Sequence, residues 1–432
     1  MLPALNFTMK TRMLPCIVAL GFGLALGQAA DPIQDRVAKG VAAELPSLVS
    51  LYKHFHANPE LSFMETETAK RLAAELRGAG LKVSTGVGGH GLVGVLKNGD
   101  GPTLLIRADM DGLPVQEETG LPHASTKQMA DDLGNTVYTM HACGHDVHTS
   151  ALVGAAHALA RLHAVGELGG RVRLFFQPAE EVMPGGAVHL MGMGVLDGVE
   201  RVFALHCDPG VDVGQVGLRL GPLTSAADRI EIRLEGTGGH TSRPHLTGDL
   251  TFALAKMTTE LPAILSRRLD PRSGVSVVWG MVQAGSAPNV IPDHGVLAGT
   301  VRILDAVAWA ECEKLVHELV HEIVRPYGVT AHLDYQRGVP PVVNESLSNR
   351  ILAEAVTEVL GPDGQVMAPQ SLGGEDFGWY LDQVPGAMMR LGTRTPGGVT
   401  YDLHQGNLHI DERAITIGAR LMAEAAWRAL RA

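Results

Sequence analysis

A short segment of the chain gathers a thiol and several imidazoles. Residues 140–148 read Met-His-Ala-Cys-Gly-His-Asp-Val-His, so Cys143 and His145 stand two residues apart, with His141 and His148 on either side. Thiolate and imidazole are the ligands that zinc and similar divalent ions prefer in proteins. A buried cysteine beside a surface histidine would give the same letters. This segment alone therefore indicates a metal site without proving one.

Two adjacent carboxylates form a second candidate group. Glu180 and Glu181 follow an apolar run at residues 172–176 and the short link Gln-Pro-Ala. One carboxylate of such a pair can bind a metal, while the other accepts the proton of a nearby water as a general base. Neighbouring glutamates are also common on solvated surfaces, but the preceding run and Pro178 favour the functional interpretation.

Two distant histidines could complete a ligand set. His206 ends the apolar run 202–205, and His404 lies in Tyr-Asp-Leu-His-Gln-Gly-Asn-Leu-His. With Cys143, His145 and Glu181 they make enough donors for two metal ions that share a bridging group. His409 is an alternative to His404 as the last ligand.

Alternating helical and apolar segments predict the fold that positions these residues. Helical periodicity, as at residues 65–78, alternates with short apolar runs, and this order is typical of an α/β fold. The runs lie at residues 103–108, 172–176, 202–205 and 387–391. Ligands in such folds bind beyond the carboxyl ends of the strands. Asp109, Asp111, the two glutamates and His206 all follow these runs, so we expect them along one edge of a mixed sheet.

Between residues 221 and 339 the pattern of elements changes. It predicts in turn strand 230–235, helix 250–267, strand 275–282, strand 295–303, helix 307–327 and strand 329–335. This β-α-β-β-α-β order is that of a ferredoxin-like sandwich and predicts a separate inserted domain. The larger catalytic domain would then consist of residues 31–220 and 340–432.

Three polar residues of the inserted segment are further candidates. His240 follows two glycines, Asn289 lies in Pro-Asn-Val-Ile-Pro, and Arg302 stands at the end of a predicted strand. They offer an imidazole, a polar donor and a fixed cation. A structural turn and a surface charge would explain the same residues equally well.

Composition excludes several classes of protein. The 432 residues are 45% hydrophobic and 19% charged, which is ordinary for a folded chain. The net charge of −11 offers no general attraction to nucleic acid or anionic lipid. The four cysteines are too few for a framework of disulfides.

The amino terminus predicts export. Lys10 and Arg12 precede an apolar run at residues 13–26, and small residues follow before Asp31. This is the pattern of a secretory signal peptide at residues 1–30. A buried or membrane-anchoring helix is less favoured, because the run is short and contains Pro15. We expect a secreted or periplasmic protein without membrane association once the signal is removed.

Six motifs in register resemble one family. They are Arg107-Ala-Asp-Met-Asp-Gly-Leu-Pro114, His141-Ala-Cys-Gly-His-Asp146, Gln177-Pro-Ala-Glu-Glu181, Gly238-Gly-His240, Pro288-Asn-Val-Ile-Pro292 and Gly374-Glu-Asp-Phe377. The family is that of the metallo-amidohydrolases and exopeptidases, which includes aminoacylases, hippurate hydrolases and indole-acetyl-amino-acid hydrolases. The resemblance runs from about residue 31 to the end and covers the two-domain layout.

The resemblance implies a role for each candidate residue. Cys143 would bridge two divalent ions of zinc, manganese, cobalt or nickel, with His145 and His206 on one ion and Glu181 and His404 on the other. Glu180 would be the general base. His240 would stabilise the oxyanion, reaching across a homodimer formed by the inserted lid or dimerisation domain. The resemblance gives the remaining residues supporting roles: substrate-carboxylate binding by Asn289 and Arg302, and orientation of the ligands by Arg107, Asp109 and Asp111.

The expected function is hydrolysis of the amide bond of N-acyl or N-aroyl amino acids, or of small peptides. A dipeptidase or carboxypeptidase with the same mechanism is one alternative, because pocket shape alone separates these substrates. An exported two-lobed protein that binds a metal and a ligand without catalysis is another. Glu180 favours catalysis, since a binding protein needs no base beside the water.

Overall fold

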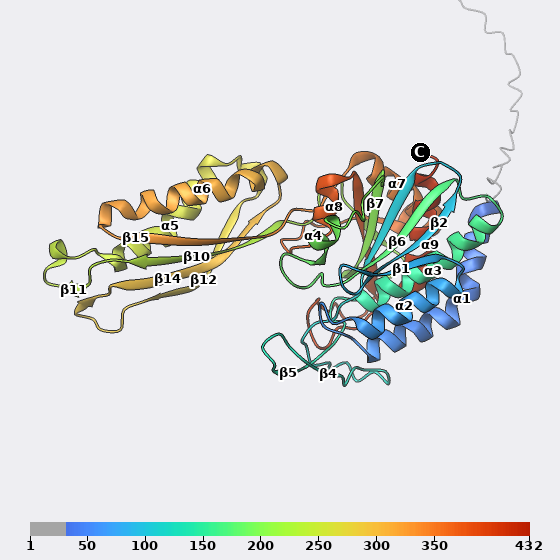
Figure 1. Cartoon of the computed structure of the whole chain (residues 1–432), viewed down its shortest axis with the longest axis horizontal. Helices are drawn as coiled ribbons and strands as arrows, with labels where there is room; N and C mark the ends of the chain where they lie inside the picture. The colour runs from blue at the N-terminus through green and yellow to red at the C-terminus, as the bar shows by residue number, and fades with distance from the viewer. Residues whose placement is uncertain (1–31) are drawn as a thin grey trace, which may run out of the picture.

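The computed structural model describes residues 32–432. The predicted signal peptide at residues 1–30 lies outside this range and stays a prediction. The described chain forms a larger body and a smaller, elongated one (Figure 1). Among residues 32–432, none of the helices combines the length and apolarity that crossing a bilayer requires.

The larger body is built on one mixed sheet. Its strands run, in spatial order, β1 (Lys82–Val87), β2 (Gly91–Asn98), β6 (Gly170–Gln177), β3 (Thr103–Asp109), β7 (Arg201–Asp212), β18 (Gly386–Arg394), β8 (Val216–Leu218) and β17 (Gln365–Met367). The central strands β6, β3, β7 and β18 are parallel, so their carboxyl ends share one edge.

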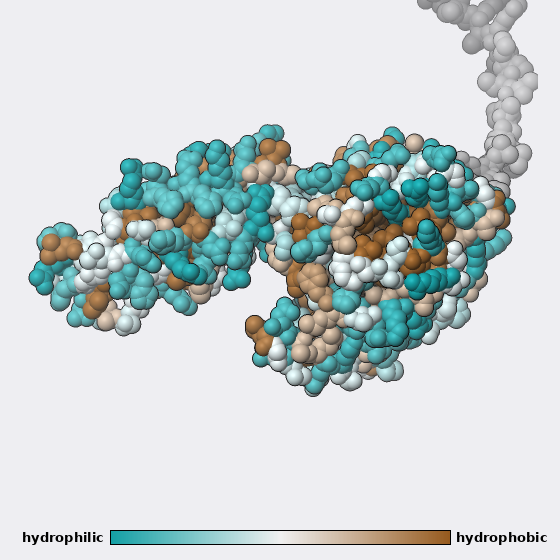
Figure 2. All heavy atoms as spheres, viewed as in Figure 1, coloured by the Kyte–Doolittle hydropathy of each residue, from teal (hydrophilic) through white to brown (hydrophobic). Residues whose placement is uncertain are grey.

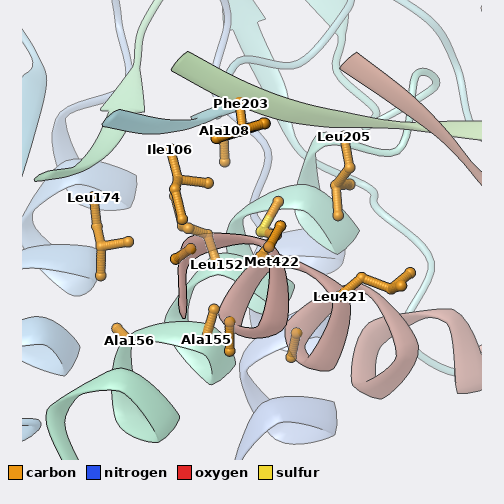
Figure 3. Packing of buried hydrophobic residues seen from close by; sticks show 14 of the residues in the cluster. Ile106, Ala108, Leu152, Ala155, Ala156, Leu174, Phe203, Leu205, Leu421 and Met422 are labelled. Atoms are coloured by element: carbon orange, nitrogen blue, oxygen red, sulfur yellow. The ribbon is translucent and has the colours of Figure 1, made fainter. Parts of the chain in front are cut away.

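Helices cover both faces of this sheet, which explains why β3 is buried throughout. Ile106 and Ala108 pack against α3 (His145–Ala164) and α9 (Arg413–Ala429), where Leu152 and Met422 meet them (Figure 3). Leu105 points to the opposite face, toward α4 (Gly186–Met191) and α8 (Gly378–Gln383). Burying each such side chain contributes roughly 1.5–3 kcal/mol.

The remaining helices of the larger body are α1 (Pro32–Ala57), α2 (Thr66–Gly78) and α7 (Ser346–Leu360). A hairpin of β4 (Gln128–Ala130) and β5 (Thr136–Tyr138) extends from its lower rim in Figure 1. Strands β9 (Gly221–Pro222) and β16 (Val343–Asn344) pair where the chain leaves and re-enters this body.

The smaller body has one antiparallel sheet with two helices on one face. Its strands run β12 (Ser276–Ala284), β14 (His294–Ile303), β10 (Ala226–Glu235) and β15 (Thr330–Val339), and its helices are α5 (Leu250–Arg268) and α6 (Ala306–Val324). Strands β11 (Gly239–His240) and β13 (Val290–Ile291) pair beyond this sheet. Residues 32–432 also contain four single turns of 3-10 helix: η1 (Pro244–Leu246), η2 (Pro271–Ser273), η3 (Arg325–Tyr327) and η4 (Pro362–Gly364).

The predicted fold class, a two-domain α/β fold with a mixed sheet, is confirmed. The order β-α-β-β-α-β is found in β10, α5, β12, β14, α6 and β15. Several strands are longer than predicted; for example, β7 continues past His206 to Asp212, and β15 continues to Val339. Each is extended because a neighbouring strand keeps pairing with it. The domain boundaries at residues 221 and 339 stay predictions.

Candidate metal centre

A cavity of about 1140 Å³ lies where the two bodies meet. The larger body contributes Cys143, the two glutamates and His206 to its wall, and the smaller body contributes Ala227 and Arg302. Figure 2 shows the molecular surface hollowed beside the narrow junction of the two bodies. The cavity therefore opens at the carboxyl edge of the central strands, where the sequence predicts the site.

The first candidate donors converge on a thiol. Ligand atoms of Cys143, His145 and His206 lie within 4.8 Å of one another, and the Cys143 Sγ lies 3.4 Å from the His206 Nε2. Gly144 makes this approach possible. Its φ is 84°, and a Cβ at this position would lie 2.9 Å from the Cys207 Sγ. Only glycine fits here, between the thiol and the start of α3.

A second donor group shares the same thiol. Ligand atoms of Cys143, Glu181 and His404 also lie within 4.8 Å of one another, and the His404 Nε2 is 3.4 Å from the Glu181 Oε2. His409 lies apart from these donors. Its ring stacks on Tyr401, and its Nδ1 lies 3.0 Å from the Asn407 carbonyl oxygen. The geometry thus brings His404 to the predicted ligands and leaves His409 outside.

Two donors depend on strained backbone. Among residues 32–432, the non-glycine residues with positive φ are Phe63, Ala179 and His404. Ala179 (φ 57°) turns the chain immediately before the two glutamates, and His404 (φ 63°) is itself a candidate ligand. Such conformations cost about 1–3 kcal/mol each and cluster at functional sites. Here they aim donor side chains into the cavity.

Hydrogen bonds at Nδ1 orient the two donor imidazoles. The His145 Nδ1 donates to the Asp111 carbonyl oxygen at 2.9 Å, and the His206 Nδ1 donates to the Cys207 carbonyl oxygen at 2.7 Å. Each ring therefore turns its Nε2 toward the donor cluster, as metal-binding histidines do. In His148 both nitrogens are used, because Nδ1 bonds Asp109 and Nε2 accepts the Cys207 N–H. His148 therefore has no free nitrogen for a metal and instead holds Asp109 and the Cys207 backbone in place.

Asp111 also places Glu181. One oxygen of its carboxylate accepts the Glu181 N–H at 3.0 Å and the Ser62 hydroxyl at 2.7 Å. Its other oxygen, Oδ1, is buried and has no hydrogen-bond partner among the described residues. Asp109 and Asp111 thus contact the residues that the sequence predicts they orient.

The donor chemistry fits divalent metal ions. The His145 Nε2 and the Glu181 Oε1 are buried and have no hydrogen-bond partner among residues 32–432, a costly arrangement unless something binds them. Burial lowers the pKa of His145, but the Asp109 and Asp111 carboxylates outweigh it and raise that pKa to about 10. Burial raises the pKa of the Cys143 thiol far above its ordinary value, and Glu181 raises it further. A thiolate here needs a cation, and the carboxylates are arranged to stabilise one.

A buried arginine lies behind the donors. The Arg107 guanidinium is fully buried and donates to Asp109 at 2.5 Å and to Asp376 at 2.7 Å, and it lies 3.1 Å from Glu375. Gln177 and Tyr380 extend this network. The sequence predicts Arg107 and Asp109 here but assigns no role to Glu375, Asp376, Gln177 or Tyr380. The sequence signal for Glu375 and Asp376 is the motif 374–377, and Gln177 begins the motif 177–181.

Glu180 lies between the donors and this network. Its carboxylate is within 4.8 Å of donor atoms of His145 and Glu181 on one side, and of Glu375 and Asp376 on the other. Burial raises the pKa of Glu180 well above its ordinary value, and the Glu375 and Glu181 carboxylates raise it further. A carboxylate with such a pKa takes and holds a proton readily.

The structure separates the three candidates of the smaller body. Arg302 lines the cavity. His240 and Asn289 lie on β11 and beside β13, at the far end of the smaller body (Figure 1). Both are exposed, and neither lines the cavity. Of these three residues, only Arg302 therefore lines the cavity of its own chain.

Fold and site together fit one class, a hydrolytic metalloenzyme, in which the donors at the edge of an α/β sheet would hold two divalent ions that activate water. The comparisons agree. The family model described as Peptidase family M20/M25/M40 matches residues 105–428. The chain belongs to this family.

Similar proteins carry related names. An N-acetyl-L-cysteine deacetylase of Bacillus subtilis is 34% identical over 389 residues, 89% of this chain and 88% of that protein. Thermostable carboxypeptidase 2 of Saccharolobus solfataricus is 33% identical over 377 residues, 86% of this chain and 92% of that protein. The crystal structure of a dinuclear metal-binding M20 peptidase from Bacillus subtilis is similar, with a TM-score of 0.75 and 33% identity over 90% of this chain and 99% of that one.

One relative is much longer. A Rhodococcus jostii protein that carries a glutamate–cysteine ligase name is 45% identical over 375 residues, which is 87% of this chain but 46% of that protein. The chain therefore spans less than half of this relative's length.

Proposed function

We propose that the protein cleaves the amide bond of N-acyl or N-aroyl amino acids, with Glu180 as the general base. The observation that carries this proposal is the place of Glu180, a carboxylate beside the donor cluster whose pKa is raised by burial and by neighbouring carboxylates. A protein that only bound a metal and a ligand would have no use for it. The name of the N-acetyl-L-cysteine deacetylase relative supports the substrate class.

The described residues divide the work. Bound divalent ions lower the pKa of water and polarise a carbonyl group, and the thiolate, imidazole and carboxylate donors suit zinc, manganese, cobalt or nickel. Cys143, His145, His206, Glu181 and His404 would hold two such ions. Glu180 takes the proton of the attacking water and returns it to the leaving amine. Arg302 pairs with the substrate carboxylate at the cavity wall.

We also propose that a second copy completes the site. His240 and Asn289 are exposed, and they are remote from the cavity of their own chain. In a homodimer they can reach the partner's cavity, where His240 would stabilise the oxyanion and Asn289 would bind substrate. The smaller body would then serve as a lid or dimerisation domain, and residues 1–30 would direct the protein out of the cytoplasm.

A peptidase is the second candidate. The carboxypeptidase relative supports it, and the same cluster would cleave a peptide amide by the same steps. Only the shape of the cavity beyond the donors would separate the two activities.

The test is release of amino acids by reduced, metal-loaded protein from N-acetyl and N-benzoyl amino acids and from dipeptides. Glu180→Gln should lower kcat by about 10²- to 10⁴-fold and leave the metal content unchanged. Metal analysis of the wild type identifies the ions. If Glu180→Gln hydrolyses at the wild-type rate, Glu180 is not the base. If metal binds and no substrate is cleaved, the binding-protein alternative is favoured.

A further inference from the structure

The cavity has a second arginine besides Arg302. Arg390 lies on β18, in register with His206 on β7. Registered residues of neighbouring parallel strands point to the same face of a sheet, and both side chains line the cavity. Arg390 is therefore a fixed positive charge on the larger body, beside a candidate metal ligand.

The Arg390 guanidinium differs from those of Arg394 and Arg107, which are paired with carboxylates. Arg394, four residues along β18, donates to Asp212 at 2.6 Å, and the fully buried Arg107 contacts three carboxylates. Arg390 is partly buried, yet within residues 32–432 it makes no side-chain hydrogen bond or ion pair. Withdrawing an unpaired charge from water is unfavourable. A cavity arginine of this kind is ready to bind an anion.

The neighbouring strand leaves space for this side chain. Gly217 on β8 is in register with Arg390. A Cβ at Gly217 would lie 3.2 Å from the Arg390 Cβ and 3.1 Å from the Ala368 Cβ, tighter than ordinary van der Waals contact. Glycine at this position therefore lets the arginine lie along the cavity wall.

Two aspartates of the cavity wall do not pair with Arg390. Asp208 also lines the wall, but its Oδ1 accepts the Gly210 N–H at 2.8 Å instead of an arginine N–H. Asp402 lines the wall as well, and its Oδ1 accepts the Leu403 N–H at 2.9 Å. The positive charge of Arg390 also acts on the donor cluster. Burial is the main cause that lowers the pKa of His206, and the charge of Arg390 lowers it further.

We propose that Arg390 binds a second anionic group of the substrate, so that preferred substrates carry two carboxylates. This inference rests on the proposed function, in which Arg302 already takes the carboxylate of the amino acid. The second carboxylate has two possible sources: an acidic side chain on the released amino acid, or a dicarboxylic acyl group such as succinyl. Both present the same chemistry to Arg390.

The test compares acidic substrates with their amides on the metal-loaded enzyme. One pair is N-acetylglutamate and N-acetylglutamine, and the other is N-succinyl-leucine and its succinamoyl analogue. We expect kcat/KM to favour the acid of at least one pair by about tenfold or more, as a charge-assisted hydrogen bond allows. The pair that shows the preference identifies the source of the second carboxylate.

Variants then assign the preference to Arg390. Arg390→Gln should reduce the acid-to-amide ratio to near one, and Arg390→Lys should restore part of it. Arg77→Gln is the matched control, because it removes the same charge from an exposed, unpaired position on α2 and should leave the ratio unchanged.

Each outcome decides something. If the wild type cleaves acids and amides equally, or if Arg390→Gln keeps the preference, the inference fails while the proposed function stands. If none of these substrates or the wider panel is cleaved, the proposed function fails. Thermal shift with N-acetylglutamate and N-acetylglutamine then tests Arg390 separately. Equal stabilisation of the wild type by the two ligands would overturn the inference.

Discussion

The two bodies of the molecule bury different kinds of side chain. The smaller body has an apolar core, and the polar side chains buried in its sheet and helices are Asp228 and Ser273. All six of its histidines, His240, His245, His294, His317, His321 and His332, are exposed. In the larger body, His145, His206 and a fully paired Arg107 lie in the interior.

This difference separates two ways of making a functional site. The larger body holds its candidate ligands in place with buried charges, each oriented by a neighbour, at a cost in stability. The smaller body carries its candidate residues on an exposed tip, so they acquire a role only against another surface. The four predictions below test this contrast.

The largest effect should come from a cysteine substitution in the larger body. Cys143→Ser removes the thiol shared by both donor groups. Removing a residue that only hydrogen-bonds to a metal ligand lowers metal affinity by about 10- to 100-fold. Removing the Cys143 ligand itself should therefore lower the affinity more and abolish activity. Metal analysis after dialysis measures it. Cys312→Ser, in the core of the smaller body, is the matched control and should keep the metal. Full metal content in Cys143→Ser would refute the assignment.

Removing a buried cation should come next. Arg107→Met leaves Asp109, Glu375 and Asp376 buried without their counter-charge, and we expect the free energy of unfolding to fall by about 3–5 kcal/mol. Arg302→Met removes a half-buried charge that makes no hydrogen bond or ion pair with residues 32–432, so stability should change by less than about 0.5 kcal/mol while KM rises. Urea denaturation measures both. Equal losses of stability in the two variants would contradict the inference that Arg107 stabilises the fold and Arg302 does not.

The exposed tip should matter for catalysis and not for stability. His240→Ala should lower kcat by about 10²- to 10³-fold through loss of oxyanion stabilisation, with the melting temperature unchanged. If His240 acts on the partner's cavity, mixing His240→Ala chains with Glu180→Gln chains should restore about a quarter of wild-type activity, because each hybrid dimer has one intact site. A mixture no more active than its parts would show that His240 does not act across a dimer.

The smallest effect concerns pH and the larger body alone. Burial lowers the pKa of His56, but hydrogen bonds to Asp146 and Glu117 outweigh it and raise that pKa to about 10. Because the folded pKa exceeds the usual 6.5, the contribution of His56 to stability is complete below about pH 6.5 and lost as pH rises through about 10. Urea unfolding between pH 7 and 10.5 should show this decline, and His56→Gln should flatten it. An equal decline of stability in His56→Gln would show that another group causes it.

Most of the fold is predictable because the pattern of apolar residues determines it. The runs at 103–108 and 172–176 are almost entirely buried, and a largely apolar run is typical of strands covered on both faces. Periodicity says less about strand ends. His206 lies inside β7, because β18 pairs alongside it, and the sequence of β7 alone cannot show this.

The site is predictable where topology forces residues together. Cys143, Glu181 and His206 meet because parallel strands end, or pass, at one edge of the sheet. The role of Asp376 is harder to predict, since its partner Arg107 is 269 residues away in sequence. The place of His240 depends on a second surface, which no pattern within one chain describes.

The span between Arg107 and Asp376 also has a consequence for biosynthesis. The ribosome releases Arg107 and Asp109 long before Glu375 and Asp376 exist, so a nascent larger body has only one of the three carboxylates that contact its central guanidinium. The smaller body, residues 226–339, is contiguous and complete before then. We expect it to acquire protease resistance first on stalled ribosomes, with the larger body following only after the last helix has emerged.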